Sequence, residues 1–169
     1  MNWLKEVRSV FRVLNKKTIL ADYKKMSRKK LGFVRSRIKH KIDFDAVALL
    51  LGKSKAQKIQ KTIVKPNEFE IFINQDLQKI KKEILRKEIV QHILIHELLH
   101  IENEDLITIS KNYNKRKKKK IHINKFDEEI FNRYNKLRKL KGIMQIQKRE
   151  YLDMAIKKIL KSVKQEKIP

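Results

Sequence analysis

The spacing of apolar residues at the start of the chain is helical. Within residues 2–30, apolar side chains recur every three or four positions, with lysine and arginine between them. This spacing places the apolar residues on one face of a helix. The pattern predicts one or two amphipathic helices packed on the rest of the protein. The residues that carry it are Trp3, Leu4, Val7, Val10, Phe11 and Leu14.

From residue 33 onward the pattern changes to alternation between apolar and polar positions. It does so around residues 33–38, again at 59–64, and at Phe69, Ile71 and Ile73, which follow the turn sequence at 65–67. Alternation with a period of two predicts strands. The apolar run 46–51, which ends at Gly52, fits either a short strand or a buried helical turn. An exposed edge of the 69–73 strand would suit pairing with an extended peptide.

The second half of the chain predicts three helices. Residues 77–101 have helical spacing, and from Ile89 onward this segment is apolar on almost every side, as in a buried helix. Two amphipathic patterns follow, one from about residue 124 to Gly142 and one from 143 onward. The expected fold is α+β: a small twisted sheet packed on the 77–101 helix, a second helix behind it, and helical extensions at both ends. We expect a single domain over 1–169, with a core at 33–140 and extensions at 1–32 and 141–169.

The buried helix contains the sequence HELLH, in which His96 and His100 lie four residues apart with Glu97 beside the first histidine. On a helix this spacing puts both imidazoles on one face, where they can bind one metal ion. At the frequencies of His and Glu in this chain, the pattern arises by chance about once in a hundred sequences. A catalytic zinc ion needs three protein ligands and one water, and Glu97 is placed to accept the proton of that water.

The third ligand must come from elsewhere in the chain. The sequence has no cysteine, so the donor is a histidine or a carboxylate. His122, just before the helix that begins near residue 124, is the favoured candidate, and Glu129 or Glu128 in that helix are the alternatives. His92, one turn before His96, is expected to be a core or cleft-lining residue. Tyr113 and Tyr134 are candidate donors to an oxyanion.

These residues resemble a known group of enzymes. The strand EFEIFIN at 68–74, the segment HELLHIE at 96–102 and His122 with Phe126 are similar to the minigluzincins, small zinc peptidases, and in outline to the SprT-like metallopeptidases. The resemblance covers about residues 33–140. It implies a zincin-like metallopeptidase fold, Zn²⁺ bound by His96, His100 and His122, and Glu97 as the general base and acid. A terminal segment that covers the cleft would make such an enzyme latent.

The net charge of +25 suggests a different function. An excess of lysine and arginine attracts polyanions, and the run from Lys115 to Lys120 is entirely basic. The alternative function is therefore a nucleic-acid-binding protein with an incidental or structural metal, or a peptidase that acts on DNA-bound proteins. A lysine-rich composition without a specific role would give the same charge. We expect a cytoplasmic protein, since no apolar run reaches the length of a membrane span and Lys5 and Arg8 interrupt the N-terminal apolar stretch.

Overall fold

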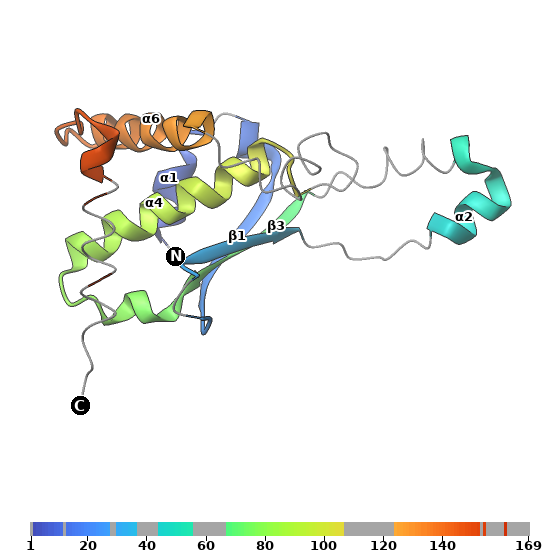
Figure 1. Ribbon diagram of the computed structural model, residues 1–169, viewed down its shortest axis with the longest axis horizontal. Helices are drawn as coiled ribbons and strands as arrows, with labels where there is room; N and C mark the ends of the chain where they lie inside the picture. The colour runs from blue at the N-terminus through green and yellow to red at the C-terminus, as the bar shows by residue number, and fades with distance from the viewer. Residues whose placement is uncertain are drawn as a thin grey trace.

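A mixed three-stranded sheet packed on a long helix forms the centre of the computed structural model (Figure 1). The structure describes residues 2–11, 13–27, 30–36, 44–55, 67–106, 124–152, 154 and 161. The predicted α+β class is confirmed. The elements are α1 (Asn2–Arg8), η1 (Val13–Lys16), β1 (Thr18–Lys24), β2 (Gly32–Ser36), α2 (Phe44–Leu51), β3 (Glu68–Asn74), η2 (Gln75–Lys79), α4 (Glu83–Glu102) and α6 (Asn124–Leu140).

Strand β3 is the central strand, as the order β1-β3-β2 shows. It runs parallel to β1 and antiparallel to β2. The predicted alternation is confirmed, because Phe69, Ile71 and Ile73 are all buried. The expectation that this strand pairs with a substrate peptide is wrong, since both of its edges already bond to neighbouring strands. In the described part of the chain, β1 and β2 form the edges of the sheet.

The N-terminal segment is helical only in part. Helix α1 and the 3-10 turn η1 agree with the predicted helices, whereas Thr18–Lys24 forms β1 instead. All seven residues of β1 pair with β3, from Thr18 opposite Glu68 to Lys24 opposite Asn74. A continuous set of main-chain hydrogen bonds to a central strand outweighs a weak helical spacing. Residues 18–24, which were expected in a helical extension, are thus part of the sheet. The boundaries at residues 32 and 140 between the core and its extensions stay predictions.

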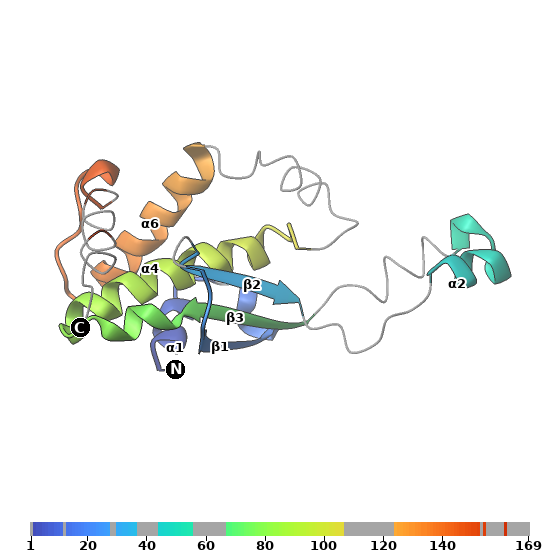
Figure 2. The same cartoon turned by 60° about the horizontal axis from the view of Figure 1, so that its bottom comes forward.

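Helix α4 lies between the sheet and α6, as both views of the molecule show (Figures 1 and 2). Its second half is buried, as its all-round apolar sequence predicted. The helix begins at Glu83 rather than near residue 77, because Asn74 caps the separate 3-10 helix η2 by accepting a hydrogen bond from the Asp76 N–H. Helix α6 starts where predicted and buries one face, formed by Phe126, Ile130, Tyr134 and Leu137.

The remaining predictions concern the run 46–51, the strand at 59–64 and the last helix. The run 46–51 belongs to a helix, α2, whose leucines are exposed rather than buried. The strand expected at 59–64 lies outside the described residues. Of the last predicted helix, residues 149–152 are helical and Leu152 is buried. Among the described residues, none of the helices combines the length and apolar character that crossing a bilayer requires.

Candidate metal centre

His96, Glu97 and His100 come together on α4, as their spacing predicted. One potential ligand atom from each of the three lies within 4.8 Å of the others. The two imidazole rings are 4.8 Å apart between centroids and nearly perpendicular, at 84°. Glu97 and His100 are buried, and His96 is partly exposed. The three side chains form a group that could hold a metal ion, with access from the side of His96.

Each imidazole has a carboxylate at its Nδ1 atom. Nδ1 of His100 lies 2.7 Å from Oδ2 of Asp105, and Nδ1 of His96 lies 3.0 Å from Oε1 of Glu97. An ionised carboxylate only accepts hydrogen bonds, so Asp105 favours a proton on Nδ1 of His100. The lone pair of the His100 ring is then on Nε2, where it can bind a metal. Metal-binding histidines in proteins are commonly fixed by carboxylates in this way, so the donor set fits a divalent ion such as zinc.

Asp105 reaches His100 because α4 ends in a tight reversal. The Glu104 N–H donates to the Ile101 carbonyl at 3.2 Å, and the Asp105 N–H donates to the His100 carbonyl at 3.3 Å. These two bonds form a Schellman motif, which requires a left-handed residue that is usually glycine. Here Glu104 occupies that position with φ 54°. The reversal returns the chain to the last turn of the helix and buries Asp105 completely.

Asp105 was not among the site residues expected from the sequence. The available signal was the acidic segment 102–105 immediately after the second histidine. What the sequence did not show was the backbone reversal, because no glycine marks it. A carboxylate five residues after a helical histidine is out of reach in a continuing helix and within reach only after this turn.

Strand β2 begins next to Glu97. A Cβ atom added at Gly32 would lie 2.6 Å from Cγ2 of Ile93, 3.2 Å from the Phe72 carbonyl oxygen and 3.5 Å from Oε1 of Glu97. Only glycine fits between the strand and the helix at this point. The main chain of an edge strand therefore passes directly beside the candidate base. Sequence reasoning missed this role, although an isolated glycine at a strand end is the usual sign of close backbone approach.

The start of α6 also lies at the site. The ring of Phe126 is 5.5 Å from that of His96 and 5.0 Å from that of His100, centroid to centroid. It covers the two imidazoles with an apolar surface. His122, the favoured third ligand, lies outside the described residues, as do Tyr113 and the basic run Lys115–Lys120.

The alternative ligands Glu128 and Glu129 are both described. Glu128 is exposed, and Glu129 accepts a hydrogen bond from Nε of Arg133 at 2.7 Å. The same guanidinium bonds to Glu102 at 3.0 Å, so it ties α6 to the end of α4. Among the described residues, the potential metal-binding group contains His96, Glu97 and His100 and neither of these glutamates. The identity of the third ligand stays a prediction.

His92, one turn before His96 on α4, packs against Tyr134 of α6. Their rings are 5.9 Å apart in an edge-to-face arrangement. Burial, with a smaller effect from the charge of His96, lowers the pKa of His92 to about 4. Burial, with a smaller effect from Glu88, raises the pKa of Tyr134 to about 12. Both side chains are therefore neutral near pH 7. Tyr134 is buried in the hydrophobic core. This position gives no reason to prefer Tyr134 over Tyr113 as the donor to an oxyanion.

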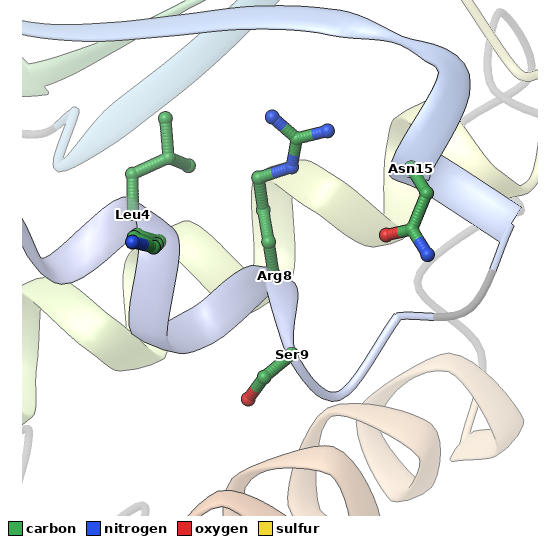
Figure 3. Close-up of a pocket in the computed structure, with 5 residues that line it drawn as sticks. Leu4, Arg8, Ser9 and Asn15 are labelled. Carbon is green, nitrogen blue, oxygen red and sulfur yellow. The ribbon is translucent and has the colours of Figure 1, made fainter.

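A separate surface hollow of about 380 Å³ lies on α1. Figure 3 shows Leu4 and Arg8 extending to the same side of that helix. The Arg8 guanidinium donates to the carbonyls of Leu14 at 2.8 Å and Lys17 at 3.1 Å, so it holds the chain that leads into β1. The described residues that line the hollow include no candidate metal ligand, and we assign it no chemistry. Its lining residues are Leu4, Lys5, Arg8, Ser9 and Asn15.

Searches against protein-family models, curated proteins and solved structures gave no match to this chain. The assignment to a family therefore stays an expectation drawn from the motif.

Proposed function

We propose that this protein is a zinc-dependent metallopeptidase with a zincin-like fold. The observation that carries the proposal is the hydrogen bond between His100 and the fully buried Asp105, on a helix that also presents His96 and Glu97. A buried histidine–carboxylate pair beside a second histidine is the arrangement that orients an imidazole for a metal.

His96 and His100 would hold the ion, with His122 as the proposed third ligand and Glu129 or Glu128 as alternatives. Phe126 packs on both imidazoles, which brings the start of α6 to the site and supports a ligand from the segment just before it. Bound zinc would polarise a substrate carbonyl and lower the pKa of a bound water towards about 7. Glu97 would take the proton from that water and later give it to the departing amine nitrogen.

The geometry of β2 supports a peptide as the substrate. This edge strand begins at Gly32, beside Glu97. An extended peptide can add to a sheet edge through main-chain hydrogen bonds. A peptide that pairs with β2 would pass along α4, where its carbonyl groups come close to the base. This assigns to β2 the role that the sequence had suggested for residues 69–73.

The test is zinc content and casein cleavage in matched variants. Glu97→Gln should keep about one zinc per chain and lose cleavage, because it removes the base and leaves both histidines. The control Glu83→Gln changes an exposed glutamate in the first turn of the same helix and should leave both unchanged. Comparing His122→Ala with Glu129→Ala identifies the third ligand by its loss of zinc. Full cleavage by Glu97→Gln would refute the peptidase mechanism.

The net charge of +25 favours nucleic-acid binding as a second candidate function. Binding that depends on phosphate contacts weakens steeply as salt rises. The affinity of the full chain for duplex DNA, measured at several salt concentrations, tests it. A flat response or no binding would leave the charge as a property of composition. DNA-dependent cleavage of a DNA-bound protein would support the combined function.

A further inference from the structure

Helix α2 exposes three consecutive leucines. Leu49, Leu50 and Leu51 are 90%, 81% and 49% exposed. They form the last turn of an eight-residue helix that Gly52 ends, with φ +80° and its N–H bonded to the Ala48 carbonyl at 2.9 Å. We call these three residues the leucine tip. A contiguous apolar surface that is exposed in this way marks an interaction site.

The leucine tip is carried on an unusually long connection. β2 ends at Ser36 and β3 begins at Glu68, although these two strands are antiparallel neighbours. A turn of about two to five residues would be enough to join them. In both views α2 lies beyond the ends of β2 and β3, away from α1 and α6 (Figures 1 and 2). A long excursion that ends in exposed leucines indicates a function outside the core.

The arrangement of the leucines favours a lipid surface over a protein groove. Successive residues on a helix are about 100° apart, so three in a row cover about 200° around the axis. A groove contacts one face of a helix, whereas an acyl layer surrounds an inserted tip on all sides. Interfacial helices insert only the depth of their apolar side chains, and no span of the bilayer is needed.

The charge around the tip favours an anionic surface. Lys53 and Lys55 follow the leucines just after Gly52, and both are exposed. In the sequence, the connection between β2 and β3 carries more basic than acidic residues, and the whole chain has a charge of +25. Basic residues next to an apolar anchor are attracted to anionic headgroups. The same charge opposes association between copies of this chain, and exposed leucines contribute nothing to phosphate contacts with a nucleic acid. The basic side chains of the connection are Arg37, Lys39, Lys41, Lys53, Lys55, Lys58, Lys61 and Lys65, and its acidic ones are Asp43 and Asp45.

We propose that the leucine tip, together with Lys53 and Lys55, docks this protein on the surface of an anionic lipid bilayer. The leucines insert among the acyl chains, and the lysines lie at the headgroups. The inference is independent of the proposed peptidase function, since no residue of the metal centre contributes to it. Loss of peptidase activity and loss of membrane binding are therefore separable.

The test is co-sedimentation of the full chain with vesicles of phosphatidylcholine, with and without phosphatidylserine. The wild type should bind the anionic vesicles. The triple variant Leu49→Gln, Leu50→Gln and Leu51→Gln should bind roughly 1,000-fold more weakly, at about tenfold for each leucine removed from the lipid. Lys53→Gln and Lys55→Gln should each weaken binding about fivefold, on anionic vesicles only.

Matched controls change residues of the same kind elsewhere. Ile84→Gln with Met144→Gln removes two other exposed apolar side chains, and Lys125→Gln with Lys139→Gln removes two exposed lysines of α6. The apolar control should bind like the wild type, and the lysine control should lose less than the Lys53 and Lys55 variants. All variants should keep the wild-type thermal midpoint, because the altered side chains lie outside the core.

Three results would overturn the proposal. The first is equal vesicle binding by the wild type and the triple leucine variant. The second is equal binding to neutral and anionic vesicles. The third is absence of vesicle binding combined with self-association that the triple variant abolishes, which would assign the leucine tip to contact between copies of the chain.

Discussion

Replacing Asp105 by asparagine tests the geometry of the candidate metal centre directly. The substitution keeps the shape of the side chain and removes its charge. The carboxylate can only accept a hydrogen bond, so it holds the proton of His100 on Nδ1, 2.7 Å away. An amide offers either its oxygen or its nitrogen, and it therefore no longer selects the tautomer that leaves the lone pair on Nε2.

The expected effect follows from burial. Both side chains of the pair are almost completely buried, at 4% and 0% exposure, so water cannot replace the lost interaction. A hydrogen bond to a charged group contributes about 1.5–3 kcal/mol, and loss of such a support costs about 10–100-fold in metal affinity. We expect Asp105→Asn to weaken zinc binding by about 10–100-fold and to lower the free energy of unfolding by about 1–3 kcal/mol.

The assay is competition for zinc with a chelating indicator, together with thermal unfolding in the presence and absence of zinc. Asp76→Asn is the matched control, because Asp76 forms a surface ion pair with Lys79 at 2.8 Å, and exposed pairs contribute little. It should leave the zinc affinity unchanged. A folded Asp105→Asn protein with wild-type zinc affinity would show that the His100–Asp105 bond does not orient a metal ligand.

Three further predictions concern folding. Gly32→Ala should lower the free energy of unfolding by about 1–3 kcal/mol through overpacking, because the new Cβ would lie 2.6 Å from Cγ2 of Ile93. Ile93→Ala in the same chain should relieve part of that cost, as measured by urea unfolding. If the effects of the two substitutions simply add, the contact between residues 32 and 93 is contradicted. Glu104→Gly should stabilise the protein by about 1 kcal/mol, since φ 54° disfavours a side chain, and Gly142→Ala at φ +66° should destabilise it by a similar amount; thermal midpoints that move the other way would refute this. The pKa of His92 falls from 6.5 to about 4 on folding, so its contribution to stability is complete above pH 6.5 and is lost as the pH falls towards 4. The loss approaches about 3 kcal/mol, and the stability difference between His92→Gln and the wild type should vary over that pH range; a constant difference would contradict the burial of a neutral imidazole.

The predictions made from the sequence succeeded where one local pattern was sufficient. The apolar run that contains HELLH had to be a buried helix, because it is apolar on nearly every side. That helix placed His96, Glu97 and His100 together without further information. The alternation at 68–74 and the spacing of α6 were equally local, and both were confirmed.

The prediction failed where two distant segments had to meet. Thr18–Lys24 has no strong strand pattern, and it is a strand because β3 offers an edge for it to pair with. Because β1 pairs with one edge of β3 and β2 with the other, β3 is the central strand. The open edge of the sheet beside Glu97 therefore belongs to β2. The leucines of α2 were expected in a short strand or a buried helical turn. An apolar run does not by itself show whether another part of the chain packs against it.

The sequence by itself determined the candidate metal-binding group of this protein: two imidazoles and a carboxylate on one helical face, because helical spacing is a property of the chain. Only the tertiary structure decided what surrounds them. Asp105 reaches His100 through a left-handed Glu104, Gly32 admits β2 beside Glu97, and Phe126 covers both rings. These contacts depend on how the elements pack against one another and on the left-handed backbone of Glu104, a position where glycine is usual. Neither property can be predicted from the periodicity of a single segment.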